Sequence, residues 1–284
     1  MKDGGGDDLE RVADLYRRAM EGHVDIGDTM DALLDAVGER IGRHRPHTRI
    51  LHLGSHAGVV AETFLRRWPE AVIAIHDEDE DLIAMARRRL AGRSVEYYTG
   101  PIASISCQVD LVVSIARHHH LPHDYLEGLR LLMKPDAVYL LADELCPEYC
   151  EGEHRRRIER ADVIHMAGGY VLTSRAEVAA FERTGGVPSD AHELEQLRRR
   201  ALWRWYRFVI DHAVMHGYFD VAVGELQSTL DDFITGSDAE HKFSPLIVER
   251  QFALAGFRQL SKRSIGSPSD PALQSMFVYE YGVA

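Results

Sequence analysis

The sequence predicts an α/β protein with a doubly wound, mainly parallel sheet that ends in an antiparallel hairpin. Short apolar runs alternate with helical stretches through the first half of the chain, as in buried parallel strands covered on both faces. A turn containing Gly54 and Gly58 follows the first such run, which is typical of a strand entering a helix beside a ligand. The last two strand-like runs are separated only by a loop, so we expect them to pair as a hairpin.

Each element follows from its hydrophobic period. Two amphipathic helices are expected first, at Leu9–Met20 and Asp28–Ile41. Right-handed crossovers then arrange the alternating region as a doubly wound sheet. The expected strands are Ile50–Leu53, Ala71–Ile75, Val95–Tyr98, Val109–Ser114 and Ala137–Ala142, separated by helices Val59–Arg67, Asp81–Leu90 and Tyr125–Met133. The chain closes with helix Pro245–Ala255 and strands Phe257–Ser264 and Met276–Tyr281.

A long insertion interrupts the alternation after the fifth strand. We therefore divide the chain into an N-terminal helical segment (1–47), a sheet domain (48–145 and 243–284) and a helical insertion (146–242). Within the insertion, Trp203, Trp205 and Tyr206 are better explained as helix core than as an aromatic cage for a cation. The expected helices of the insertion are Arg155–Ala167, Arg175–Thr184, Ala191–His216 and Gly224–Phe233.

Composition excludes several classes of function. The 284 residues carry a formal net charge of −12, so a nucleic-acid partner is not expected, because phosphates require a basic face. Three cysteines, with no pair at zinc-site spacing, predict neither a disulfide framework nor a metal. The run His118–His120 with nearby His123 does not change this, since consecutive loop histidines point in different directions. No signal sequence or membrane-length apolar stretch is recognisable, so we expect a cytoplasmic protein that does not bind membranes.

A candidate ligand crevice lies where the first two strands end. Gly54 and Gly58 allow the backbone to approach a ligand closely. Asp77 and Glu78 follow the second strand, where a carboxylate can accept hydrogen bonds from two ribose hydroxyls. Together these features predict a nucleoside-containing ligand.

Three further segments carry a family resemblance. The strand Val109–Ser114 is followed by His119-His120-Leu121-Pro122 and then by Leu131-Leu132-Met133-Lys134-Pro135, and Leu254-Ala255-Gly256-Phe257 precedes a late strand. In order and spacing these segments resemble the class I S-adenosylmethionine-dependent methyltransferases, over residues 48–145 and 243–283. The resemblance implies a Rossmann-like sheet, a helical cap over the carboxyl ends of the strands, and S-adenosylmethionine as cofactor. It places the cofactor at Gly54, Ser55, His56, Gly58, Asp77, Glu78, Pro101, Ile102 and Ser114.

The cofactor loop departs from the family pattern at three places. His52 stands where the family has an acid, His56 where it has a glycine, and Pro101-Ile102 where it has an acid near the adenine. Either the loop binds the cofactor through main-chain groups, or the site has been repurposed or lost. His56 either fills space or has been recruited to the reacting centre, and we expect recruitment. Tyr16 either covers the cofactor or simply packs.

The resemblance implies transfer of a methyl group to a small molecule, in specialised metabolism. Methyl transfer requires that the two reactants are oriented in a site without water. It requires a base only when the nucleophile carries a proton. His119 and Asp143 are the candidates, together with His56, although Asp143 could instead hold an ammonium or cap a turn. The signature of family members that methylate amino groups of DNA and protein is absent after the fourth strand, where Ile115-Ala116-Arg117 stands instead.

Two alternatives remain open. One is a cyclase or aminocarboxypropyl transferase that releases methylthioadenosine, similar to azetidine-2-carboxylate synthases. The other is a non-catalytic protein of the same fold. The sequence does not determine the oligomeric state, and a homodimer is compatible with it.

Overall fold

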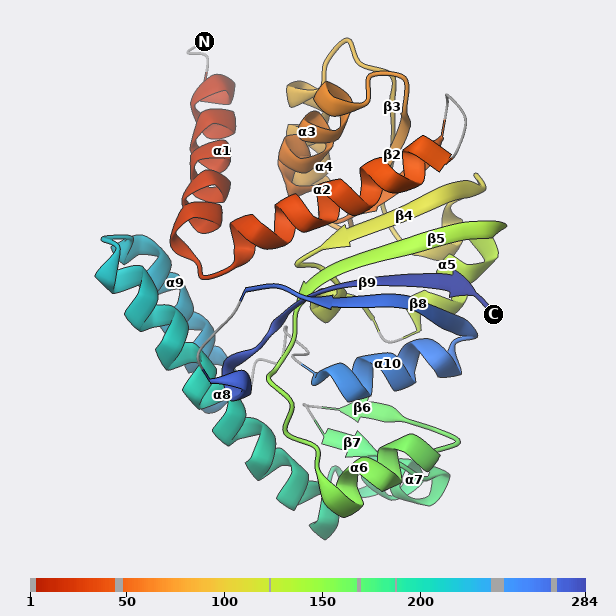
Figure 1. Cartoon of the computed structure of the whole chain (residues 1–284), viewed down its shortest axis with the longest axis vertical. Helices are drawn as coiled ribbons and strands as arrows, with labels where there is room; N and C mark the ends of the chain where they lie inside the picture. The colour runs from red at the N-terminus through yellow and green to blue at the C-terminus, as the bar shows by residue number, and fades with distance from the viewer. Residues whose placement is uncertain are drawn as a thin grey trace.

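The computed structural model describes residues 4–43, 48–122, 124–167, 170–186, 188–235, 243–266 and 270–284. The strands of the main sheet are β1 (Arg49–Leu53), β2 (Val72–His76), β3 (Val95–Tyr98), β4 (Val109–Ile115), β5 (Met133–Glu144), β8 (Phe257–Ser264) and β9 (Met276–Val283). These described residues form a seven-stranded sheet in the order β3-β2-β1-β4-β5-β9-β8 (Figure 1). The first five strands are parallel, and β9 is antiparallel to both β5 and β8. The predicted α/β fold with its antiparallel terminal hairpin is confirmed.

Alternate residues of the strands enter two different hydrophobic cores, because successive side chains of a strand point to opposite faces. Ile50 and Leu111 pack with helices α2 (Ile26–Arg43), α3 (Val59–Arg67) and α4 (Glu80–Arg89). Leu51 and Val112 pack on the opposite face, which is covered by α5 (Tyr125–Leu132) and α10 (Pro245–Leu254). Both faces are therefore buried, and the near-continuous apolar strands of the sequence follow from this.

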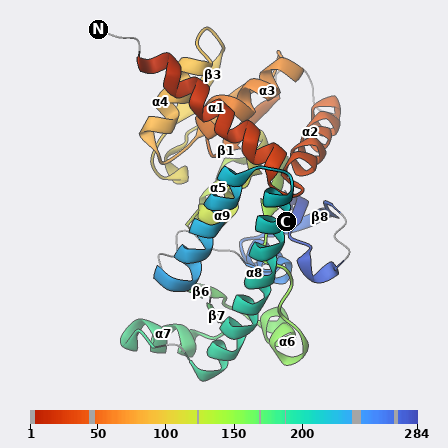
Figure 2. The ribbon, with the colours of Figure 1, turned by 90° about the vertical axis from the view of Figure 1, so that its left-hand side faces the viewer.

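The first helix, α1 (Gly4–Gly22), stands at the carboxyl ends of the strands rather than on a face of the sheet (Figures 1 and 2). It packs against the turn that follows β1 and against the insertion. The N-terminal segment consequently forms one wall of the crevice that the sheet topology creates.

The insertion has two parts with different positions. Its second part, α8 (Ser189–Met215) and α9 (Phe219–Leu230), reaches the carboxyl ends of the strands and lies beside α1 (Figure 2). Its first part, α6 (Gly152–Arg160), β6 (His165–Ala167), β7 (Tyr170–Leu172) and α7 (Arg175–Thr184), lies beyond α10, away from the crevice (Figure 1). Only the second part is in a position to cover the crevice.

One helix of the insertion was predicted wrongly. Residues Arg155–Ala167 do not form a single helix, since α6 ends at Arg160 and His165–Ala167 pairs as β6 with β7. The pairing lets Val171 and Leu172 bury against the core, and this tertiary contact outweighs the local helical period. A smaller difference concerns α9, which begins at Phe219 instead of Gly224. The predicted domain boundaries at residues 47 and 242 lie outside the described residues.

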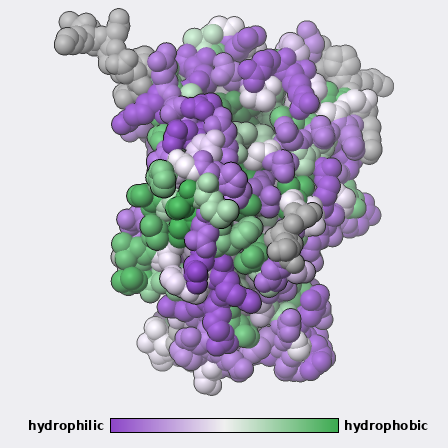
Figure 3. Space-filling view, turned by 60° about the vertical axis from the view of Figure 1, so that its left-hand side comes forward, coloured by the Kyte–Doolittle hydropathy of each residue, from purple (hydrophilic) through white to green (hydrophobic). Residues whose placement is uncertain are grey.

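The outer surface of α9 is apolar. Phe219, Val223, Leu226 and Leu230 are exposed at spacings of four, three and four residues, so they form one stripe of the helix. Figure 3 shows hydrophobic residues gathered on this side of the molecule. In the part of the chain that the structure describes, no helix combines the length and the apolar character needed to cross a bilayer.

Candidate functional site

The loop after β1 has a strained backbone at the centre of the crevice. Gly54 and Gly58 have φ of 82° and 84°, which glycine adopts without cost. His56 and Ala57 also have positive φ, 45° and 49°, which costs an L-residue roughly 1–2 kcal/mol. A Cβ on Gly58 would lie 3.1 Å from the Ala86 Cα, so helix α4 packs too closely for another residue. Strain of this kind gathers at ligand sites, and the ligand-binding role of this loop stays a prediction.

Asp77 supports this loop from the end of β2. Its Oδ2 accepts a hydrogen bond from the Ser55 amide at 2.6 Å, and its Oδ1 accepts one from the Asp79 amide at 3.1 Å. Burial raises the pKa of Asp77, but these amide hydrogen bonds outweigh burial and leave that pKa below its ordinary value. Glu78 is exposed. Of the two predicted ribose-binding acids, only Asp77 reaches the loop.

Arg117 is a site residue that the sequence prediction missed. Its side chain lies over Gly54, with Cγ 2.9 Å from the position a Cβ there would take. Its guanidinium lies 3.5 Å from Asp77 Oδ1. The preceding Ala116 has φ of 46°, which turns the chain back toward the crevice. The available signal was a basic residue two positions after the end of β4, but the sequence prediction used this segment only as evidence that another motif is absent.

The ring of His56 contacts the rings of both Tyr16 and His52. The His56 Nε2 donates to the Ile115 carbonyl at 3.0 Å, which ties the loop to the end of β4. The Tyr16 ring packs edge-on against His56, and the His56 ring stacks with that of His52. Burial lowers the pKa of His52 to about 3 and of His56 to about 4, so both are neutral near pH 7. Burial, reinforced by the charge of Asp77, raises the pKa of Tyr16 to about 12.

His119 and Asp143 form a buried hydrogen-bonded pair at the ends of β4 and β5. His119 Nδ1 donates to Asp143 Oδ1 at 2.7 Å, and Asp143 also accepts the backbone amides of His118 and Glu144. Burial raises the pKa of Asp143, but the His119 imidazole and the hydrogen bonds outweigh burial and leave that pKa below its ordinary value. The carboxylate therefore orients the imidazole, which leaves His119 Nε2 as the nitrogen with the lone pair.

A pocket with a volume of about 530 Å³ opens in front of this pair. Its walls come from α1, α9 and the ends of β4 and β5, four segments that are far apart in the sequence. Tyr16 lines the pocket and also contacts His56, so it stands between the pocket and the loop after β1. Arg18 and Asp220 join α1 to α9 at the edge of the pocket, with N–O distances of 2.5 and 2.6 Å.

The remaining predicted residues have other surroundings. Ser114 is buried beside Leu53, where β4 pairs with β1. Ile102 is buried in the core beneath α5, and Pro101 is exposed. His123 lies outside the described residues. Among the residues that are described, no three side chains of the metal-binding types gather at one point.

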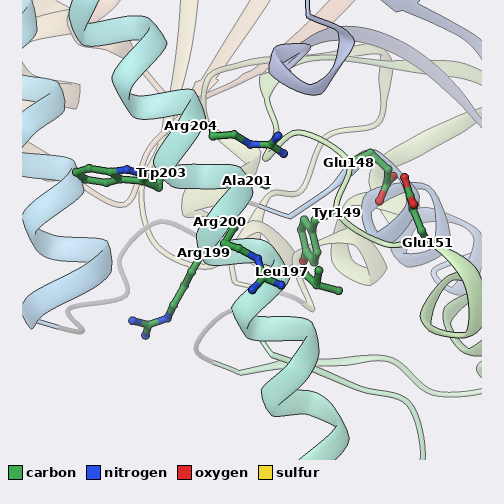
Figure 4. A pocket seen from close by; sticks show the side chains of 9 residues that line it. All are labelled: Glu148, Tyr149, Glu151, Leu197, Arg199, Arg200, Ala201, Trp203 and Arg204. Carbon is green, nitrogen blue, oxygen red and sulfur yellow. The ribbon is translucent and has the colours of Figure 1, made fainter.

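The aromatic group of the insertion is mainly core, in agreement with the preferred interpretation. Trp205 and Tyr206 are fully buried, whereas Trp203 is half-exposed. Trp203 instead borders a second hollow between α8 and the segment after β5 (Figure 4). Arg199, Arg200 and Arg204 also line that hollow (Figure 4). The described lining of that hollow includes no predicted site residue, whereas the predicted His119 lines the pocket beside α1 and α9.

Solved structures share this arrangement of strands and helices. An S-adenosylmethionine-dependent methyltransferase from Clostridium acetobutylicum ATCC 824 superposes with a TM-score of 0.54 at 8% identity, over 97% of this chain and 98% of that chain. This chain has the class I methyltransferase fold. No protein-family model matches the sequence, and no curated protein matches it.

Two other structures of the class I methyltransferase fold are more distant. The magnesium protoporphyrin IX methyltransferase ChlM from Synechocystis PCC 6803, with bound S-adenosylhomocysteine, has a TM-score of 0.49 at 11% identity, over 99% of this chain and 96% of that chain. The mitomycin 7-O-methyltransferase MmcR has a TM-score of 0.45 at 13% identity, over 84% of this chain. This chain spans 49% of the MmcR structure.

Proposed function

We propose that this chain is an S-adenosylmethionine-dependent methyltransferase that acts on a small molecule, in specialised metabolism. The observation that carries the proposal is His119, which is hydrogen-bonded to Asp143 and lines a pocket at the carboxyl ends of β4 and β5. Ligands of open α/β sheets bind at this edge, and a volume of about 530 Å³ suits a small molecule.

The residues of the loop fit the cofactor once one side chain moves. Asp77 retains lone pairs for ribose hydroxyls beyond the two amides that it accepts. Gly54 leaves room for a ligand against the backbone only if the flexible Arg117 side chain gives way. His52, fully buried with neither ring nitrogen hydrogen-bonded among the described residues, shows that polar groups here are not all satisfied within the protein. When bound, S-adenosylmethionine supplies an electrophilic methyl group.

The residues of this chain would then perform three tasks. His119 Nε2 would take the proton from a hydroxyl or amine nucleophile, and Asp143 would stabilise the resulting imidazolium. The pocket walls from α1 and α9 would position the nucleophile and exclude water. Tyr16, which stands between pocket and loop, would separate the substrate from the cofactor except where the methyl group passes.

The decisive experiment identifies the nucleoside product. The purified protein is incubated with S-adenosylmethionine, alone and with pools of small hydroxyl and amine compounds, and the products are analysed by mass spectrometry. S-Adenosylhomocysteine formed only with an acceptor supports methyl transfer. Methylthioadenosine formed from the cofactor alone instead supports the cyclase or aminocarboxypropyl transferase.

A second candidate, a non-catalytic protein of this fold, is favoured by one specific observation. Arg117 and His56 occupy the space beside Gly54 and Asp77, the place that the resemblance assigns to the cofactor. Calorimetry distinguishes the two candidates. Absence of S-adenosylhomocysteine binding by folded protein, both with Arg117 and with Arg117→Ala, would favour the non-catalytic protein.

A further inference from the structure

The hollow between α8 and the segment after β5 is separate from the pocket beside His119, since the two share no described lining residue. Its volume is about 710 Å³, which is in the range of small-molecule sites. Arginines of α8 line it together with Glu148 and Glu151, which belong to the segment between β5 and α6 (Figure 4). The hollow therefore presents charges of both signs.

Arg200 and Arg204 are the arginines of this hollow whose charge is not already neutralised. Arg199 forms an ion pair with Glu195 at 2.5 Å. Within the described part of the chain, neither Arg200 nor Arg204 has a hydrogen bond or an ion pair. They are four residues apart and share one face of α8, and like charges at this spacing destabilise a helix. An anionic group bound by both guanidinium groups would remove that repulsion.

The Tyr149 hydroxyl is an independent indication of such a group. Tyr149 lines the hollow and is 6% exposed, and its hydroxyl has no hydrogen-bond partner among the described residues. Burial raises the pKa of Tyr149 well above its ordinary value, so the hydroxyl keeps its hydrogen and can donate. Buried polar atoms of native proteins are nearly always hydrogen-bonded. A donor without an acceptor, in the same hollow as two unpaired arginines, indicates that a ligand supplies the acceptor.

The two glutamates supply the opposite charge. Glu148 is held in place, because its two carboxylate oxygens accept the amides of Cys150 and Leu246 at 2.9 and 3.2 Å. Glu151 is exposed and has no hydrogen bond or ion pair among the residues described. Neither glutamate forms an ion pair with an arginine of this hollow. Opposite charges that line one hollow without pairing match a ligand that itself carries both charges.

The remaining lining that the structure describes is apolar. Leu197, Ala201 and Trp203 contribute to it from α8. Trp203 is 52% exposed, so a large apolar surface at this hollow is left for an apolar ligand body to cover.

We propose that this hollow binds a free α-amino acid with an apolar or aromatic side chain. The carboxylate of the ligand binds to Arg200 and Arg204, whose planar guanidinium groups match its geometry, and accepts the Tyr149 hydroxyl. The ammonium donates to the two glutamates, and the side chain lies against Trp203. The inference goes beyond the proposed function and does not depend on it, because it concerns a different site.

The first test removes each charged group of the ligand in turn. L-Phenylalanine, 3-phenylpropanoate (without the ammonium) and 2-phenylethylamine (without the carboxylate) are titrated into the full chain at pH 7 and followed by saturation-transfer NMR. L-Leucine and L-tryptophan are titrated alongside. We expect L-phenylalanine to bind about tenfold more tightly than either analogue, since each analogue loses one charge pair. An analogue that binds as tightly as L-phenylalanine, or no binding by any of the three amino acids, would overturn the proposal.

Two charge variants place the binding in this hollow. Arg204→Gln should weaken L-phenylalanine binding about tenfold and leave 2-phenylethylamine unaffected, because the amine has no carboxylate. Glu151→Gln should weaken L-phenylalanine binding about threefold and leave 3-phenylpropanoate unaffected. The matched control Arg207→Gln, exposed on α8 and outside the described lining, should keep the wild-type affinity. An unchanged affinity for L-phenylalanine in Arg204→Gln would overturn the proposal.

A third variant, Tyr149→Phe, separates ligand binding from a structural role of the hydroxyl. It should weaken L-phenylalanine binding about threefold to tenfold, while the melting temperature without ligand stays equal to that of the wild type or rises. The melting temperature should not fall, because the variant removes a buried donor that has no partner in the free protein. A lower melting temperature with unchanged affinity would contradict the assignment of Tyr149 to a ligand.

Discussion

Arg117 reaches back over the end of β1, and its Cγ lies 2.9 Å from the point where a side chain on Gly54 would begin. The same side chain brings its guanidinium to 3.5 Å from the Asp77 carboxylate. Arg117 alone thus covers Gly54 and Asp77, two of the residues on which the prediction of a nucleoside ligand was based. A cofactor at this place has to displace Arg117, and its affinity must include the cost of that displacement.

Arg117→Ala should therefore bind S-adenosylhomocysteine more tightly than the wild-type chain does. We expect a gain of about threefold to tenfold in affinity by calorimetry, because an ordered, flexible side chain no longer has to move. Arg87→Ala, which removes an arginine of α4 that packs on Tyr97, is the control and should leave the affinity unchanged. Weaker binding by Arg117→Ala would show instead that Arg117 holds the cofactor.

His119→Gln should lower turnover without weakening cofactor binding. Loss of a positioned base typically costs about 10²- to 10⁴-fold in rate, and the buried Asp143 would lose the imidazole that it orients. The measurement is kcat alongside S-adenosylhomocysteine affinity, with His192→Gln, an exposed residue near the start of α8, as the control. Turnover within about twofold of wild type would remove His119 from the chemistry.

His56→Gly separates the two interpretations of the altered loop. The positive φ of His56 favours glycine, and the imidazole is engaged with the Ile115 carbonyl, so we now expect equal or tighter cofactor binding with little change in turnover. This expectation follows the space-filling interpretation and departs from the recruitment that we expected from the sequence. A fall of about 10²-fold or more in turnover, with binding intact, would restore recruitment.

His52 should make the folded state sensitive to acid. Burial lowers its pKa to about 3 in the native protein, while the unfolded chain protonates His52 near pH 6.5. Between these two pH values the unfolded state therefore binds more protons than the native state does. The free energy of unfolding is consequently at its full value above about pH 6.5 and declines as the pH falls toward 3.

The size of the pH dependence that His52 causes can be tested with His52→Leu. Between pH 7 and pH 5 the wild-type free energy of unfolding should fall more than that of His52→Leu, by up to about 2 kcal/mol. Urea denaturation at the two pH values measures both. Equal losses in the two proteins would contradict a neutral, buried His52.

Local patterns were sufficient to predict the sheet. Runs such as Ile50–Leu53 and Val109–Ser114 are apolar throughout because both faces are buried, and the loop between the last two runs limits them to a hairpin. The same reasoning indicated Gly54, Asp77 and Asp143, because the sheet topology brings the ends of parallel strands to one edge, whereas His119 was indicated by the family resemblance. It did not predict β6 and β7, whose short strands are stabilised by pairing and by burial against α8 rather than by their own propensity.

The set of side chains that line the pocket was decided by tertiary structure alone. His23, Glu144 and Glu225 lie more than eighty residues apart along the chain from one to the next, and no local period relates them. Arg117 is adjacent to a recognised motif, but its direction depends on the positive φ of Ala116 and on the space above Gly54. Sequence periodicity records which face of an element is buried. Which side chains from separate elements meet depends on how those elements pack.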